Sequence, residues 1–400
     1  MKVGTPGFFS ERLRAGREAR GLSAASLAEM IGISKAAVSQ YENGHGSPAP
    51  DVMRRIGQVL NLPLQHFLLA PPAEDDGLPF FRCMAAATKT ARVRAFRRYR
   101  WFREIVHSLQ YYVKLIHPNV PELSLPSDPK AISDSMIEDY ATLTRRTWNL
   151  GDGPISNVVW LLENNGFIVA RHDLCADSLD AFSLWTDNRS TPYVILGTAK
   201  HSAARSRFDA AHELAHLLLH NTVESRSFNY NSDFRFLEQQ AHRFAGAFLL
   251  PAASFSEDLR GAVSLDLLRC LKSKWKVAIG AMISRAAQLN LISESHERRL
   301  WINMGRRHWR TREPLDDTLE IEQPRFIRRS IELVIDKGIV SAADLPFQIG
   351  LSERDIEELC GLRESYFSEA MGRIRIDLKD RCTSEIPNPE PRIIQFQRQA

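Results

Sequence analysis

The chain has 400 residues, of which 44% are hydrophobic and 25% charged, with a formal net charge of +4 at pH 7. This balance is typical of a folded protein with two or three domains and excludes a mainly disordered or fibrous chain. Five scattered cysteines without a C-x-x-C pair argue against a disulfide framework, and no signal peptide or apolar run of about 18 residues is present. We therefore expect a cytoplasmic protein with no membrane partner.

The first 69 residues are predicted to form short helices, and the segment 22–44 has the pattern of two helices joined by a tight turn. Gly32 occupies the turn, where a positive φ is tolerated, and Ser34 is suited to cap the second helix. A helix that enters the major groove needs small or hydrogen-bonding residues on its outer side. The residues predicted there are Lys35, Ala36, Ser39, Gln40 and Asn43. A helical bundle that binds other proteins is the alternative.

A stretch rich in proline, aspartate and glycine, residues 70–79, predicts a linker. Apolar residues then recur at three- and four-residue spacing, which predicts one long helix over 80–116 that ends before Pro118. This helix carries nine basic residues and a single acidic one. Such an excess beside a DNA-binding segment favours phosphate contacts, and docking against an acidic protein surface is the alternative. The candidates for phosphate contact are Arg92, Arg97 and Arg98.

The rest of the chain mixes a small number of strands with many helices. Short runs rich in β-branched or aromatic residues predict strands at 166–171, 181–185 and 192–196. Helical periodicity predicts helices at 137–148, 156–164, 202–220, 234–250, 265–274, 277–289, 326–337, 341–348 and 352–359. The tail from residue 385 is expected to be loose.

One predicted helix contains the pentapeptide HELAH. His212 and His216 lie on one face of that helix, so both imidazoles can bind one ion, and Glu213 is placed to take a proton from water. The expected ion is zinc, with a third protein ligand and one open position. Glu238 on the next helix is the candidate third ligand. His242, one turn later, is either an alternative ligand or a group that orients one of the two histidines.

The surroundings of the pentapeptide are otherwise largely apolar. Histidine pairs at this spacing also occur on surface helices without a metal. Two histidines and a glutamate on a buried helix need polar partners, however, and a metal ion with a water supplies them. The sequence therefore favours a metal site.

Two family resemblances extend these predictions. Residues 8–70 resemble the XRE, or phage-repressor, helix-turn-helix family through LRAGREARGLSAASLAEMIGISKAAVSQYENG and the helices that follow it. Residues 135–295 resemble the ImmA/IrrE metallopeptidases through RFDAAHELAHLLLH, LEQQAHRFAGAFLLP and LRCLKSKWKVAIGAMISRAAQLNLIS. The second resemblance implies a zinc peptidase site with His212, His216 and Glu238 as ligands and Glu213 as general base. It also implies a substrate that is a repressor-type regulator or the chain itself.

We therefore predict a multidomain, mainly α-helical protein with four parts. These are an XRE-type helix-turn-helix domain of five helices (1–72), a linker with a basic connecting helix (73–125), an α+β zincin-like metallopeptidase domain with a small sheet (126–295), and a helical C-terminal region with a loose tail (296–400). The expected function is a DNA-binding transcriptional regulator with a zinc-dependent endopeptidase, acting in a stress, phage or mobile-element response. We expect a homodimer that binds double-stranded DNA and a protein substrate.

Two other functions are compatible with the same motifs. One is a non-enzymatic transcription factor whose zinc domain is a structural or ligand-sensing module, because structural zinc sites are closed whereas catalytic ones keep an open position. The other is a protein-interaction adaptor with no DNA role. The intact Glu213 beside the metal ligands favours the enzyme.

Overall fold

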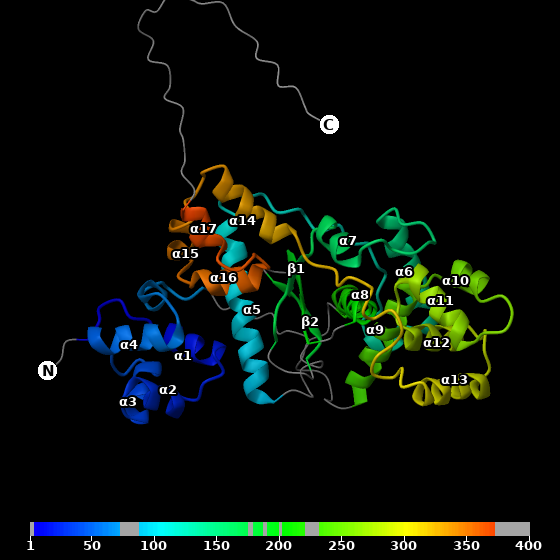
Figure 1. Cartoon of the computed structure of the whole chain (residues 1–400), viewed down its shortest axis with the longest axis horizontal. Helices are drawn as coiled ribbons and strands as arrows, with labels where there is room; N and C mark the ends of the chain where they lie inside the picture. Colours follow the sequence, from blue (N-terminus) through cyan, green and yellow to red (C-terminus); the bar gives the residue numbers. More distant parts are fainter. Residues whose placement is uncertain are drawn as a thin grey trace, which may run out of the picture.

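The computed structural model describes residues 4–72, 88–174, 179–186, 190–199, 202–220 and 232–372. Most of the predicted linker at 70–79 and the whole tail from residue 385 lie outside these ranges. The chain is mainly helical with one small sheet, as predicted (Figure 1). Among the described helices, none is both long enough and apolar enough to cross a bilayer.

The N-terminal domain confirms the predicted series of short helices. Gly32 ends one helix with a φ of 68°, and the Ser34 hydroxyl caps the next by accepting a hydrogen bond from the Ala37 N–H at 3.1 Å. Arg17 holds that second helix in place through a bidentate contact with the buried Glu42, at 2.5 and 2.8 Å. The elements are α1 (Ser10–Ala19), α2 (Ala24–Ile31), α3 (Lys35–Glu42), α4 (Pro50–Leu60) and the 3₁₀ turn η1 (Leu64–Phe67).

Helix α5 (Lys89–Leu109) lies within the predicted helix over 80–116, of which residues 80–87 are outside the described ranges. Thr88 caps its N-terminus, and the helix ends at Leu109, earlier than predicted. Beyond Leu109, Tyr112, Val113 and Leu115 still pack against the core, whereas Tyr111 and Ile116 are 78% and 45% exposed.

The basic residues of α5 correct part of the phosphate-contact prediction. Arg98 is only 3% exposed and pairs with Glu358 at 2.6 Å, so it is not available to DNA. Arg97 is partly exposed, but its guanidinium donates to Glu18 of α1 at 2.8 Å. Arg92 is partly exposed, and its contact with phosphate stays a prediction. Two basic residues of α5, Arg97 and Arg98, therefore pair with carboxylates of other helices.

The central part of the chain contains the sheet and most of the remaining helices. Strand β3 (Thr191–Leu196) lies between β1 (Ile168–Arg171), which is parallel to it, and β2 (Ala181–Thr186), which is antiparallel. All three predicted strands are confirmed, and α10 and α13 are additional helices. The helical elements are η2 (Pro129–Ala131), α6 (Asp134–Thr147), α7 (Val158–Asn164), α8 (Ala203–Leu219), α9 (Ser232–Leu249), α10 (Ala252–Asp258), α11 (Leu265–Trp275), α12 (Ile279–Gln288) and α13 (Glu294–Arg306).

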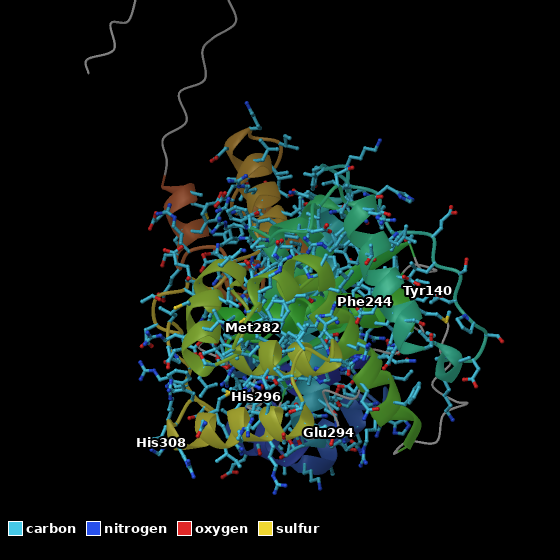
Figure 2. The ribbon with its side chains drawn as sticks, turned by 90° about the vertical axis from the view of Figure 1, so that its right-hand side faces the viewer. Tyr140, Phe244, Met282, Glu294, His296 and His308 are labelled. Atoms are coloured by element: carbon cyan, nitrogen blue, oxygen red, sulfur yellow. The ribbon has the colours of Figure 1, made fainter. Side chains whose placement is uncertain are left out.

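The sheet separates two hydrophobic cores. Alternate residues such as Phe182 and Tyr193 face α5, and Tyr99 of α5 contacts both aromatic rings edge-on. Their neighbours Ala181 and Val194 belong to the second core, with α8 and α9. Helix α13 packs onto α12 in that second core, and Figure 2 shows Met282 of α12 above Glu294 and His296 of α13.

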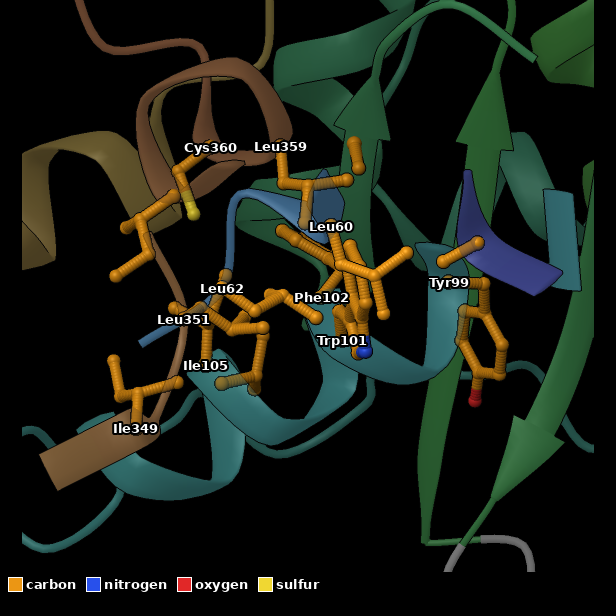
Figure 3. Packing of buried hydrophobic residues seen from close by; sticks show 14 of the residues in the cluster. Leu60, Leu62, Tyr99, Trp101, Phe102, Ile105, Ile349, Leu351, Leu359 and Cys360 are labelled. Atoms are coloured by element: carbon orange, nitrogen blue, oxygen red, sulfur yellow. The ribbon is translucent and has the colours of Figure 1, made fainter. Parts of the chain in front are cut away.

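The C-terminal helices return to the N-terminal domain. They are α14 (Phe326–Asp336), α15 (Asp344–Ile349), α16 (Glu353–Cys360) and α17 (Tyr366–Met371). Leu351 and Leu359 share a core with Leu60 of α4 and Phe102 of α5, as Figure 3 shows. Helices α14 to α17 therefore pack with the N-terminal domain and α5, whereas α13 and the segment that follows it, which includes Glu313 and Asp316, pack with the central domain. The domain boundaries themselves stay predictions.

Two buried polar contacts join the N-terminal domain to these helices. Arg20 donates two hydrogen bonds of 2.6 Å to the carboxylate of Asp355, which is 2% exposed. His66 lies 2.9 Å from the Gly350 carbonyl through its Nδ1. Burial, assisted by Arg12, lowers the pKa of His66 to about 4, so the ring is neutral at pH 7 and donates its Nδ1–H to that carbonyl.

Substitution of Asp355 by alanine is expected to loosen this junction. It leaves the Arg20 charge without its buried partner, which typically costs about 3–5 kcal/mol of stability. We expect a lower melting temperature and faster amide hydrogen exchange in α1 and α16, measured by mass spectrometry. The control is Asp344→Ala, which removes an exposed aspartate on α15. Equal exchange in the two variants would contradict a stabilising role for the Arg20–Asp355 pair.

Candidate functional site

The metal ligands predicted from the sequence meet between α8 and α9. His212 Nε2 lies 3.0 Å from His216 Nε2 and 3.5 Å from Glu238 Oε2. His216 Nε2 lies 3.3 Å from Glu238 Oε1. These three side chains form the one group in the described part of the chain whose ligand atoms converge closely enough to hold a metal ion.

The spacing of the three ligands fits zinc. Ligand atoms placed tetrahedrally at the usual 2.0–2.1 Å from zinc lie about 3.3 Å from one another, close to the three separations found here. Burial opposes ionisation of Glu238, but the adjacent His212 and His216 outweigh this effect and hold the pKa of this carboxyl well below its usual range. The site therefore presents a carboxylate and two imidazoles, the donor set of many zinc enzymes.

Glu213 lies next to the ligands and is held by a strand. Its side chain is 3% exposed, and the Ser183 hydroxyl of β2 donates to Glu213 Oε2 at 2.7 Å. Ser183 itself is fully buried. Within the described ranges no donor bonds to Glu213 Oε1, which leaves that oxygen available for a proton. The strand thus sets the orientation of the predicted general base.

A chain of buried hydrogen bonds continues from His216 away from the ligands. His216 Nδ1 lies 2.9 Å from His220 Nδ1, and His220 Nε2 lies 3.0 Å from Gln240 Oε1. The Gln240 amide nitrogen donates to the carbonyls of Pro129 and Ile132, at 2.9 and 3.1 Å. His220 is fully buried, and this burial together with the adjacent His216 lowers its pKa to about 3, so the ring is neutral.

These contacts determine the direction of each hydrogen bond between Gln240, His220 and His216. Because the Gln240 amide nitrogen is used by two carbonyls, its oxygen faces His220 and must accept. His220 therefore carries its proton on Nε2 and accepts on Nδ1. It follows that His216 donates from Nδ1, which leaves the lone pair of its Nε2 directed at the other ligands. The backbone at Pro129 and Ile132 thus selects the tautomer in which His216 binds a metal.

Gln240→Leu is expected to weaken zinc binding by about 10–100-fold, the usual effect of losing a partner that orients a ligand. Without the amide oxygen, His220 loses the acceptor that fixes its tautomer, and His216 is no longer held with its Nε2 lone pair facing the site. The affinity is measured by competition with a chromophoric chelator. Gln239→Leu is the matched control, because Gln239 is the exposed neighbour on the same helix. Equal affinities would contradict the assignment.

His242 does not join the three ligands. Its ring lies 4.5 Å from that of His212 and stacks on Phe208 at 5.7 Å. The prediction that it orients His212 is therefore compatible with its position, and stays a prediction.

The predicted base-reading residues are all solvent-exposed on α3 or at its C-terminal end: Lys35, Ala36, Ser39, Gln40 and Asn43. Asn43 is partly engaged, because Arg14 donates to its Oδ1 at 2.7 Å. Their contact with DNA stays a prediction.

Comparisons with known proteins agree with the two folds. Residues 13–67 match the helix-turn-helix family model, and residues 163–286 match the model of the IrrE N-terminal-like domain, a peptidase family. Over these two ranges the chain is similar to XRE-type helix-turn-helix proteins and to the IrrE-like peptidase family, respectively. The second match covers α8, α9 and the sheet, and so includes all three candidate metal ligands.

Three curated relatives, all named as HTH-type transcriptional regulators or repressors, match a short part of the chain. The chain is 40% identical over 58 residues to the HTH-type transcriptional repressor RghR of Bacillus subtilis, and 38% identical over 63 residues to the uncharacterized HTH-type transcriptional regulator RghRB of that organism. It is 44% identical over 62 residues to a Pyrococcus furiosus protein whose name describes an HTH-type transcriptional regulatory protein. These matches cover 14–16% of this chain and 43%, 45% and 20% of the three relatives, respectively.

Sequence reasoning missed three residues that support the site: Ser183, His220 and Gln240. His220 carried a signal, because it lies one turn after His216 on the same helical face. Ser183 carried a weaker one, as a polar residue in the apolar strand AFSLWT. Gln240 carried none, because its role depends on the backbone of a segment 108 and 111 residues earlier.

Proposed function

We propose that this protein is a DNA-binding transcriptional regulator with a zinc-dependent endopeptidase that cleaves a repressor-type regulator or the chain itself. The observation that supports the peptidase is the convergence of His212, His216 and Glu238 beside the buried carboxylate of Glu213. A non-enzymatic, ligand-sensing zinc module remains the alternative. The position of Glu213 favours the enzyme, because a purely structural site has no need of a fourth, proton-accepting group.

In the proposed reaction, the chain contributes ligands and a proton acceptor. A zinc ion in this site would polarise a peptide carbonyl and make water acidic enough to react at neutral pH. Glu213 takes the proton of the attacking water at Oε1, while Ser183 holds Oε2 in place. The same carboxyl then passes this proton to the departing amine nitrogen as the C–N bond breaks, which leaves a new carboxyl group on one fragment and a new amino group on the other.

Glu213→Gln is expected to keep zinc and lose cleavage. The amide has nearly the same shape but cannot accept the proton, whereas the three ligands are unchanged. We expect about one zinc per chain by metal analysis in both proteins, and cleavage of co-expressed repressor-type regulators, or of the chain itself, in the wild type alone. Cleavage that persists in the variant would exclude Glu213 as general base, and absence of cleavage in both proteins would favour the ligand-sensing alternative.

The helix-turn-helix domain supports the DNA-binding half of the proposal. Helix α3 presents its exposed polar residues on one side, while Glu42 on the other side is bound by Arg17 of α1. An amide such as Gln40 can pair with adenine through two hydrogen bonds. Binding as a homodimer to paired half-sites is part of the same proposal.

Gln40→Ala is expected to lower specific DNA affinity by about 1–3 kcal/mol while leaving non-specific binding nearly unchanged. A duplex selected from a random pool provides the specific site, and binding is measured against scrambled duplex at fixed salt. Gln58→Ala, which removes an exposed glutamine of α4, is the matched control. An equal loss on both duplexes would show that Gln40 does not read a base.

A further inference from the structure

A cavity of about 750 Å³ lies beside the candidate metal ligands. Phe208 of α8 and His242 of α9 form the wall nearest to them, and the His242 ring lies 4.5 Å from the ring of His212. The other lining residues come from α8, α9, α12 with the residue before it, α13 and the segment after α13. The cavity therefore begins where the ligand cluster ends.

The helical period of α8 and α9 explains why the cavity adjoins the candidate metal ligands. Phe208 lies four residues before His212 on α8, and Gly246 lies eight residues after Glu238 on α9. Residues four apart share a helical face and are separated by about one turn, or 5.4 Å. An extended peptide advances about 3.3 Å per residue, so a side chain one or two residues from a bond held at the metal reaches this cavity.

The walls of the cavity are mainly apolar. Phe208, Ala281, Trp301 and Met304 contribute to them. At Gly246 the floor is open, because a Cβ added there would meet only Arg285 and Gln288, both at 3.6 Å. The buried Gln288 Oε1 has no hydrogen-bond donor among the described residues, so it can accept one from an N–H group of an occupant.

The charges at the cavity do not cancel. Arg285 is paired with Glu138 at 2.6 and 2.8 Å, and Glu313 is paired with the buried Lys272 at 2.8 Å. Two arginines remain without a carboxylate partner in the described part of the chain. Arg205 donates to the Arg310 carbonyl at 2.8 Å, and Arg310 donates to the Trp301 carbonyl at 3.4 Å. The rim is therefore cationic above an apolar floor.

We infer that this cavity selects the substrate by binding a large apolar side chain whose neighbour in the peptide is acidic. The apolar side chain fills the space between Phe208, Trp301 and Met304, and the adjacent carboxylate lies at Arg205 and Arg310. This inference rests on the proposed peptidase function, because it places the occupant on one side of the bond to be cleaved. The substrate class is thus an acidic–apolar segment of a protein.

The test uses zinc-loaded, full-length Glu213→Gln, so that binding is measured without cleavage. The probes are two fluorescein-labelled peptides of glycine and alanine that differ only in a central Phe-Glu or Phe-Gln pair, followed by fluorescence anisotropy. We expect the Phe-Glu peptide to bind about tenfold more tightly, a difference that weakens with salt. Arg205→Gln and Arg310→Gln should each reduce this preference, whereas Arg299→Gln, which removes an exposed charge of α13 outside the cavity, should not.

The predicted binding of an apolar side chain is tested by placing a larger residue at Gly246, which lines the cavity. Gly246→Leu should weaken binding of both peptides at least tenfold. Gly246→Ala should have a smaller effect on binding and keeps the helix folded, because alanine favours a helix interior over glycine. Circular dichroism checks the fold of each variant.

Equal binding of the two peptides, or unchanged binding in folded Gly246→Leu, would overturn the inference. Cleavage by the wild-type chain is followed separately on the same peptides. A charge preference in binding that persists without cleavage supports the cavity while contradicting the peptidase. Cleavage by the wild-type chain without a binding preference for the Phe-Glu peptide overturns the inference about the cavity and leaves the proposed peptidase function intact.

Discussion

The burial of helix α5 is the constraint on which the arrangement of the chain depends. Trp101, Phe102 and Ile105 are almost completely inaccessible, and they lie on more than one face of the helix. One helix cannot bury such a surface against a single neighbour. The N-terminal domain, the sheet and the C-terminal helices all pack around α5, as Figures 1 and 3 show. A DNA-binding domain that would otherwise be tethered by a linker is thereby docked onto the rest of the molecule.

The same requirement for partners shapes the metal centre. Polar groups buried beside an apolar helix are costly unless each one is hydrogen-bonded. Gln240 satisfies this requirement through two backbone carbonyls and so directs the imidazoles of His220 and His216. Ser183 does the same for Glu213 from the sheet. The geometry of the candidate site therefore depends on the backbone at η2 and on a side chain of β2 as well as on the three candidate ligands.

The availability of positive charge depends on which carboxylates each arginine pairs with, and not on the net charge of the segment that contains it. The basic residues of α5 suggest an electrostatic arm for DNA when the sequence is read alone, but Arg98 pairs with Glu358, and Arg97 with Glu18. At the cavity beside the candidate metal site, Arg205 and Arg310 donate to backbone carbonyls and have no carboxylate partner among the described residues. An excess of positive charge in one segment therefore does not identify a DNA-binding surface until the carboxylates that pair with it from distant segments are known.

The sequence by itself determined the local features of this protein. Helical and strand periods, caps such as Ser34, and the i,i+4 spacing of His212 and His216 depend on residues within one or two turns, so they predict the helices, the strands and the approach of the two imidazoles. Glu238 was also within reach, because its helix is the next one after α8 in the sequence. The tertiary structure alone decided the burial of Arg98 and the contacts of Ser183 and Gln240. Each of these depends on contacts between segments far apart in the chain, and no local pattern records which distant backbone or carboxylate will supply the partner.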